Sequence, residues 1–206
     1  MYFCQNTKAP LKMTEKLLKR RIILSSNSPR RKELLKNLKI PFQVIVKNNI
    51  DESLPDEIKK EDAAKFLAIK KASFYDEEIR HNDTILITAD TIVLTDNKIL
   101  GKPSGHKEAF DMLRSLSGRN HKVITGIAIT SSEKQVAFDV KTTVYFKELT
   151  DEEINYYITN FSPFDKAGAY GIQEWIGMIG ITRIEGSYFN VVGLPVQKLY
   201  SELIKF

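Results

Sequence analysis

The stretch IILSSNSPRRKELLKNL, residues 22–38, sets the expected architecture of the chain. Its first five residues form a short apolar run, which is typical of a buried strand. Ser28 is a good N-cap residue and Pro29 fits the first turn of a helix, so we expect a helix to begin there. The apolar stripe of that helix consists of Leu34, Leu35 and Leu38. A strand followed directly by a helix favours an α/β fold.

The rest of the chain continues to alternate between strands and helices. Further strands are expected at residues 41–46, 84–94, 121–130 and 135–146, and further helices at residues 61–80, 107–116, 151–159 and 195–206. The last third before Pro195 is expected to consist of strand and glycine-rich loop. Because neighbouring strands also look hairpin-connected, we expect an α/β protein with a mixed β-sheet flanked by helices, not a purely parallel sheet.

The composition indicates one ordinary globular domain. The 206 residues are 42% hydrophobic and 28% charged, and no Pro/Gly/Ser-rich linker divides them. We expect an N-terminal extension at residues 1–21 and a single domain at residues 22–206. No apolar run reaches the roughly eighteen residues that a membrane span needs, and the N-terminus does not resemble a signal peptide. The single cysteine, Cys4, fits a reducing compartment, so we expect a cytoplasmic protein.

The formal net charge of +5 favours an anionic partner. Much of the excess lies near the start of the chain, where a solvated basic arm is an equally simple explanation. Nucleic-acid binding is not expected, because basic and aromatic residues do not alternate along one surface. A small polyanion such as a triphosphate fits the charge.

Hydroxyl and guanidinium groups follow the first strand in SSNSPRR, residues 25–31. The start of a helix attracts anions and disfavours cations in its first turn. Arg30 and Arg31 therefore stand where helix stability does not favour them, whereas guanidinium groups bind phosphate well. Further candidate phosphate donors are Ser25, Ser26 and Ser28. The alternative is a capped helix with two solvated arginines.

Asp90 is placed at the far end of the apolar strand TILITADTIV. A carboxylate there must be exposed in a cleft, paired with a cation or bound to a metal. It can coordinate a divalent ion or activate water. Glu52 is the natural second carboxylate, although Asp51 beside it leaves the choice open. The alternatives are a turn-forming aspartate and ordinary solvated loop acids.

Two lysines are further candidates for binding an anion. Lys102 precedes Pro103, which biases its backbone to an extended conformation. Lys71 lies on the helix expected at residues 61–80, where an ordinary surface position is the alternative.

Two glycine-rich stretches, DKAGAYGIQE at residues 165–174 and GSYFNVVGLP at residues 186–195, allow the backbone to approach a ligand closely. Gln173 can recognise the edge of a base through its amide, and Thr91 offers a hydroxyl group. The chain contains no GxSxG, Walker A or CxxC motif, which excludes several common enzyme classes. Its histidines show no metal-ligand spacing and are expected at the surface: His81, His106 and His121.

Taken together, these motifs resemble the Maf family of nucleotide pyrophosphatases from about residue 22 to the C-terminus. The matching segments are SNSPRR at 26–31, ADT at 89–91, GKP at 101–103, LSGRNHKVITG at 116–126, DKAGAYGIQ at 165–173 and GSYFNVVGLP at 186–195. One short match is weak evidence, but so many in the family's order are highly specific.

The resemblance implies a single Maf-like catalytic domain with an elongated fold and a deep cleft, similar to inosine-triphosphate pyrophosphatases. It implies release of pyrophosphate and a nucleoside monophosphate with Mg²⁺ or Mn²⁺. Asp90 falls on the family's catalytic acid, and Glu52 on a carboxylate assigned to metal or water. Positions that handle phosphate or substrate choice fall on Ser26, Arg30, Arg31, Lys71, Thr91, Lys102 and Gln173.

The segment AGAYGIQ resembles the branch that acts on dTTP and UTP, not the branch that prefers 7-methyl-GTP. Glu174-Trp175 departs from the smaller, glycine-containing pair expected there, and Thr88 stands where glycine is common. The first departure bears on the base pocket or on a subunit contact. Trp175 is expected either in the core or in a subunit contact. The resemblance also implies a homodimer and a nucleoside triphosphate as substrate, whereas the lack of a long apolar run leads us to expect no membrane partner.

The mechanism expected from these residues is hydrolytic attack on the α phosphorus. Asp90 and Glu52 would hold the metal ion while Asp90 orients or deprotonates water, and the basic residues would neutralise the triphosphate. The alternative is a non-catalytic nucleotide- or nucleic-acid-binding regulator of cell division or septum formation. A general phosphomonoesterase would instead release orthophosphate.

Overall fold

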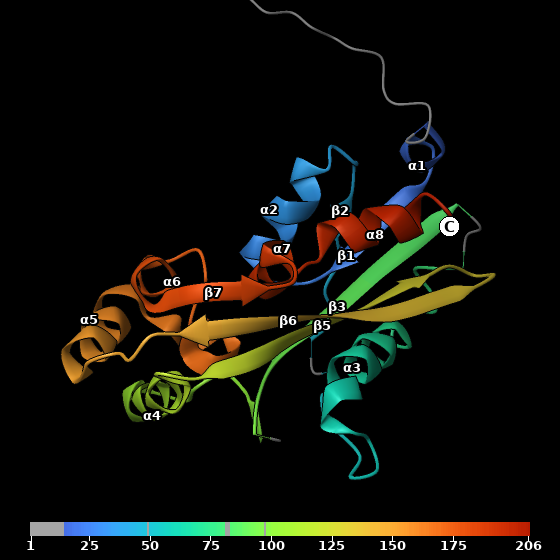
Figure 1. Ribbon diagram of the computed structural model, residues 1–206. Coiled ribbons are helices and arrows are strands. Elements are labelled where there is room, and N and C mark those ends of the chain that lie inside the picture. The colour runs from blue at the N-terminus through green and yellow to red at the C-terminus, as the bar shows by residue number, and fades with distance from the viewer. Residues whose placement is uncertain (1–14, 49, 81–82, 97) are drawn as a thin grey trace, which may run out of the picture.

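The computed structural model describes residues 15–48, 50–80, 83–96 and 98–206. Among these residues, seven strands form one mixed sheet in the order β2-β1-β3-β5-β6-β7, with β4 paired to β3 (Figure 1). The strands are β1 (Arg21–Ser25), β2 (Gln43–Val44), β3 (Thr84–Thr95), β4 (Lys98–Leu100), β5 (Asn120–Thr130), β6 (Gln135–Phe146) and β7 (Ile181–Glu185). β1 runs parallel to β2 and β3, and the other pairs are antiparallel. The expected mixed sheet is confirmed.

Helices cover both faces of the sheet and one of its ends (Figure 1). The α-helices are α1 (Glu15–Leu18), α2 (Pro29–Asn37), α3 (Ala63–Ala72), α4 (His106–Leu116), α5 (Asp151–Phe161), α6 (Trp175–Gly180), α7 (Tyr188–Val192) and α8 (Val196–Leu203). Short 3-10 turns are η2 (Lys60–Asp62), η3 (Pro163–Asp165) and η4 (Ala167–Ala169). Helix α3 lies on one face, α2 and α8 on the other, and α4, α5 and α6 gather at one end. No helix in the described part of the chain is long and apolar enough to span a membrane.

Strand β1 is buried on both faces, which explains its continuous apolar sequence. Ile22 and Leu24 pack with Leu35 of α2 in one core cluster. Ile23 points to the opposite face and packs with Ala68 of α3 in another cluster. The strand–helix unit at residues 22–38 therefore joins two cores, and Ser28 caps α2 by accepting a hydrogen bond from the Arg31 backbone N–H at 3.4 Å.

The short helix α1 contributes to the core before the first strand begins. Leu17 is buried and packs into the same cluster as β1 and α2. Residues 1–14 lie outside the described residues, and the division of the chain at residues 21 and 22 stays a prediction.

The helix expected at residues 61–80 is wrong over its second half, because α3 ends at Ala72. The cause is Tyr75, whose side chain is fully buried. Its hydroxyl accepts hydrogen bonds from Ser25 Oγ at 2.7 Å and from the Lys47 backbone N–H at 2.8 Å. These tertiary contacts hold the chain after Ala72 beside β1 instead of along the helix axis.

Three other expectations needed correction. The strand expected at residues 41–46 is reduced to β2, an edge strand that follows a proline with no N–H to donate. The strand expected at residues 84–94 is confirmed as β3, but Asp90 lies in its middle and not at its far end, because the second half of β3 pairs with both β4 and β5. Helices α6 and α7 occupy the last third, where strand and loop alone were expected before Pro195.

Gly126 lets α3 lie directly against the sheet. It is paired in register with Asp90 of β3. A Cβ atom at Gly126 would lie 2.3 Å from backbone atoms of Ala64 and Lys65 on α3, far inside van der Waals contact. Lys71 lies two helical turns after Ala64, and the close approach of α3 to the sheet brings it to the level of Asp90.

Candidate active site

A cleft of about 710 Å³ opens between the loop after β1, the middle of β3 and residues 165–173, a size typical of small-molecule sites. Six basic and three acidic side chains line it, so it carries a formal excess of three positive charges. Its charged lining residues are Arg30, Arg31, Lys47, Glu52, Lys71, Asp90, Lys102, Asp165 and Lys166. Such a surface attracts a polyanion.

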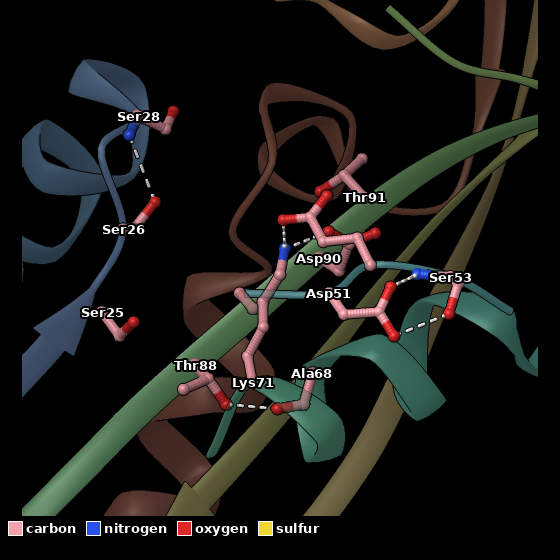
Figure 2. A network of polar contacts seen from close by, with 12 residues as sticks. Ser25, Ser26, Ser28, Asp51, Ser53, Ala68, Lys71, Thr88, Asp90 and Thr91 are labelled. Atoms are coloured by element: carbon pink, nitrogen blue, oxygen red, sulfur yellow. Dashed lines mark hydrogen bonds and ion pairs between the residues drawn. The ribbon is translucent and has the colours of Figure 1, made fainter. Parts of the chain in front are cut away.

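Lys71 and Asp90 both line the cleft, and their side chains point toward each other (Figure 2). Lys71 Nζ lies 2.6 Å from Asp90 Oδ1 and 3.0 Å from Glu52 Oε1. The side chains of Lys71 and Asp90 are only 13% and 15% exposed, whereas Glu52 is 56% exposed. Since charges this far removed from water require a partner, Lys71 and Asp90 form a buried ion pair, and the more exposed Glu52 contacts the same ammonium group.

The structure also distinguishes Glu52 from its neighbour Asp51. The Asp51 carboxylate turns away, accepting hydrogen bonds from Lys70 Nζ at 2.8 Å and from the backbone N–H and hydroxyl of Ser53 at 2.9 and 2.8 Å (Figure 2). The hydrogen bond from Lys70 is the main reason why the pKa of Asp51 lies below its usual value. Glu52 is therefore the loop acid that faces Asp90.

Arg31 lies in the cleft, but its donors are bound to the protein. Its Nε donates to the Gly193 carbonyl, Nη1 to the Ala89 carbonyl and Nη2 to Thr91 Oγ1, each at 2.8 Å. Burial lowers the pKa of Arg31, although nearby Asp90 favours the charged form. Arg31 thus contributes a fixed positive charge and joins α2, β3 and the turn after α7.

Arg30 is more available than Arg31. One of its nitrogens, Nη1, lies 2.8 Å from Asp165 Oδ2, and its side chain is 19% exposed. A guanidinium group has five N–H donors, so this single contact leaves others that can bind an oxyanion. Arg30 is the arginine of the pair with the geometry for phosphate.

The three serines at the end of β1 and in the loop after it differ in their surroundings. Ser25 donates its hydroxyl hydrogen to Tyr75 and so points toward the core. Ser26 Oγ accepts a hydrogen bond from the Ser28 backbone N–H at 3.2 Å (Figure 2). All three line the cleft, as the sequence predicts, and Ser26 and Ser28 shape the start of α2.

Thr91, Lys102 and Gln173 also line the cleft. The Thr91 hydroxyl is shared between Arg31 and Thr125 Oγ1, the latter at 2.9 Å, so it helps to anchor the arginine. Lys102 and Gln173 are exposed residues of the cleft lining. The structure thus brings every predicted site residue to one cleft.

Asp165 and Lys166 are cleft residues that the sequence analysis missed. Lys166 is almost fully buried, and its Nζ lies 2.7 Å from Asp165 Oδ1 and 3.0 Å from Glu174 Oε1. Burial alone raises the pKa of Asp165, but hydrogen bonds from Lys166 and Arg30 outweigh it and hold the pKa below the usual value. The adjacent opposite charges at the start of DKAGAYGIQE are the sequence signal for this ion pair.

The surface position expected for His121 is wrong. Its ring is 2% exposed, stacks on Phe146 and meets the hydroxyl of Tyr170 through Nε2 at 2.7 Å. Burial lowers the pKa of His121 to about 4, so the ring is neutral at pH 7. His121 supports Tyr170, which lines the cleft. Of the other two histidines, His106 is exposed as expected, and His81 lies outside the described residues.

The similarity of this chain to known proteins covers nearly its whole length. A family model described as Maf-like protein matches residues 21–206. A dTTP/UTP pyrophosphatase of Parabacteroides distasonis is 52% identical over 94% of this chain and all of its own length. A dTTP/UTP pyrophosphatase of Phocaeicola vulgatus is also 52% identical, again over 94% of this chain and all of its own.

Among solved structures, the Ham1 protein of Staphylococcus aureus has the same fold. The two superpose with a TM-score of 0.52 at 14% identity, covering 89% of this chain and 98% of the Ham1 chain. At this identity the likeness concerns the fold alone, and it confirms the expected fold class.

Proposed function

The chain belongs to the Maf family, and on this premise we propose that it hydrolyses dTTP and UTP to the nucleoside monophosphate and pyrophosphate. Two relatives that share half of its residues over their whole length carry the name dTTP/UTP pyrophosphatase. The observation that carries the proposal is the Lys71 ammonium group between the Asp90 and Glu52 carboxylates, inside a cleft with excess positive charge. A binding-only cleft for triphosphate has no need of two converging acids.

In the proposed reaction, a water oxygen bonds to the α phosphorus and the bond from that phosphorus to the bridging oxygen breaks. Asp90 orients the water and accepts its proton, because this carboxylate is the more buried of the two acids. Pyrophosphate leaves with the bridging oxygen. Arg30, Lys71 and Lys102 offset its developing charge, while Arg31 adds a fixed positive charge.

We further propose a divalent cation, Mg²⁺ or Mn²⁺, held by Asp90 and Glu52. Oxygens of both side chains lie within 3.0 Å of Lys71 Nζ, so both can reach one cation, and a metal ion would displace the ammonium group from between them. Within the described residues, no group of three or more His, Cys, Asp or Glu side chains could hold a metal. A pair of carboxylates nevertheless fits Mg²⁺, which commonly takes its other ligands from substrate phosphates and water. When bound, such an ion polarises phosphoryl oxygens and offsets their charge.

Two further assignments complete the proposal. A cytoplasmic location is supported by the single cysteine, which permits no internal disulfide.

A homodimer is supported by an aromatic cluster at the α5–α6 end, where the rings of Tyr156 and Trp175 lie 4.8 Å apart and Met178 is 74% exposed. Trp175 itself also packs against the core there. Sedimentation velocity of wild type and Met178→Glu tests the dimer; a monomeric wild type would contradict it.

The test of the activity is product analysis with dTTP, UTP, CTP, ATP, GTP and 7-methyl-GTP, with Mg²⁺ and with chelator. We expect pyrophosphate and monophosphate, greatest from dTTP and UTP and lost with chelator. Asp90→Asn should abolish turnover while the circular dichroism spectrum is retained. Triphosphate binding without turnover in wild type would instead favour a regulator, and orthophosphate as the first product would favour a phosphomonoesterase.

A further inference from the structure

A chain of ion pairs links Arg30 in the cleft to the start of helix α6. Arg30 is paired with Asp165 at 2.8 Å, and Asp165 with Lys166 at 2.7 Å. Lys166 is in turn paired with Glu174 at 3.0 Å. Because the Lys166 side chain is only 8% exposed, its two acidic partners balance a charge that water hardly reaches.

Glu174 uses its side chain in an unusual way for its position. It is the N-cap residue of α6, where an acidic side chain commonly accepts from the helix N–H groups, yet it makes no capping hydrogen bond. The carboxylate turns inward instead. Its Oε1 faces Lys166, and its Oε2 accepts a hydrogen bond from the hydroxyl of the fully buried Tyr157.

The same contacts fix the turn that carries Gln173. Tyr157 accepts a hydrogen bond from the Gly171 backbone N–H at 3.0 Å, and the Glu174 backbone N–H donates to the Gly171 carbonyl at 3.0 Å. A Cβ atom at Gly171 would lie 2.7 Å from Glu174 Cδ, so the glycine and the carboxylate pack directly together. Gln173 lies inside this turn and lines the cleft.

We propose that Glu174 is a positioning residue for nucleobase selectivity, which holds the turn at residues 171–174 so that Gln173 presents its amide to a pyrimidine base. This inference rests on the proposed function. An amide held in one direction offers one pattern of donor and acceptor, whereas a loosened turn lets it adapt to other bases. In this chain the Glu174 carboxylate, paired with Lys166 and hydrogen-bonded to Tyr157, fixes the turn.

The test compares Glu174→Gln with wild type, using kcat and KM for dTTP and for 7-methyl-GTP. Glutamine keeps the size of the side chain but cannot balance the Lys166 charge. We expect the ratio of kcat/KM for dTTP over 7-methyl-GTP to fall about tenfold, chiefly through KM for dTTP, because a misplaced recognition group weakens the preferred substrate most.

Glu153→Gln is the matched control. Glu153 is paired with Lys147 at 2.6 Å and is 26% exposed, close to the 23% of Glu174, but it does not line the cleft. It should lower the melting temperature without changing the selectivity ratio. Tyr157→Phe should reproduce part of the Glu174→Gln effect, and the double variant should show less than the product of the two single effects.

An unchanged ratio in folded Glu174→Gln, or an equal loss in Glu153→Gln, would overturn the inference. A fall in kcat for both nucleotides at a constant ratio would also overturn it, because this would indicate charge balance without base selection. If wild type shows no turnover, the proposed function fails independently. The same ratio is then measured from Kd values for the two nucleotides by calorimetry, with the same expected tenfold loss.

Discussion

Replacing Gly126 by alanine perturbs the active site through the packing of helix α3 alone. The added methyl group would lie 2.3 Å from backbone atoms of Ala64 and Lys65, and backbone cannot rotate away as a side chain can. Ordinary contact begins at 3.4 Å, so the helix and the sheet must separate by about 1 Å. Lys71 moves with the helix, while Asp90 stays on the sheet opposite Gly126.

The magnitude follows from this displacement. Overpacking of a core contact costs about 1–3 kcal/mol, and the rigid backbone on both sides places this contact near the upper end. For a chain of this size, about 3 kcal/mol lowers the melting temperature by roughly 6–12 °C. A displacement of about 1 Å in a positioned group lowers the catalytic rate by roughly 100-fold. The variant should therefore lose activity even at temperatures where it stays folded.

The assay combines thermal unfolding with kcat/KM for dTTP at a temperature well below the melting point. Gly105→Ala is the matched control, because nothing lies within 4 Å of its added Cβ and its φ of −179° suits any residue. We expect the control to match wild type in both measurements. If folded Gly126→Ala keeps the wild-type kcat/KM, the close packing of α3 against the sheet does not position Lys71.

Three other perturbations test separate parts of the site. Lys71→Met leaves Asp90 and Glu52 without their shared cation and should lower kcat for dTTP at least about 100-fold in steady-state assays; an unchanged kcat would remove the lysine from the mechanism. Arg30→Lys replaces a planar fork with a point charge and should raise KM for dTTP about tenfold, whereas a wild-type KM would contradict phosphate binding. His121 has a pKa of about 4 when folded and 6.5 when unfolded, so only the unfolded chain gains its proton as the pH falls through this window. Stability should therefore fall on the order of 3 kcal/mol between pH 6.5 and 4, and urea unfolding should show a shallower decline in His121→Phe; equal slopes would contradict this.

The sequence predicts those parts of the fold that depend on local pattern. The mixed sheet, the capped helix after Ser28 and the helix after Thr150 are confirmed, since their apolar periodicity and caps are local signals. The end of α3 was not predictable in this way, because it depends on where Tyr75 finds partners on β1 and the following loop. His121 was misplaced for the same reason: its burial comes from Phe146 and Tyr170, which are distant in sequence.

The candidate site was predicted as a set of residues but not as a geometry. The residue pattern offered Asp90, Glu52 and Lys71 as candidates, the family resemblance assigned their roles, and the structure brings them together. The sequence does not distinguish Arg30 from Arg31, since both are arginines at adjacent positions. In the structure, Arg31 is bound to backbone carbonyls while Arg30 keeps free donors. Only the folded arrangement separates an anchoring side chain from one available to a ligand.

The central claim is water attack on the α phosphorus of a pyrimidine triphosphate, and hydrolysis of dTTP in ¹⁸O-labelled water tests it most directly. Mass spectrometry of the products shows which phosphorus received the water oxygen. We expect one ¹⁸O atom in the nucleoside monophosphate, none in pyrophosphate, and no labelled product from Asp90→Asn. Label in the pyrophosphate would indicate attack on the β phosphorus, and label in orthophosphate attack on the γ phosphorus; either result would contradict the account.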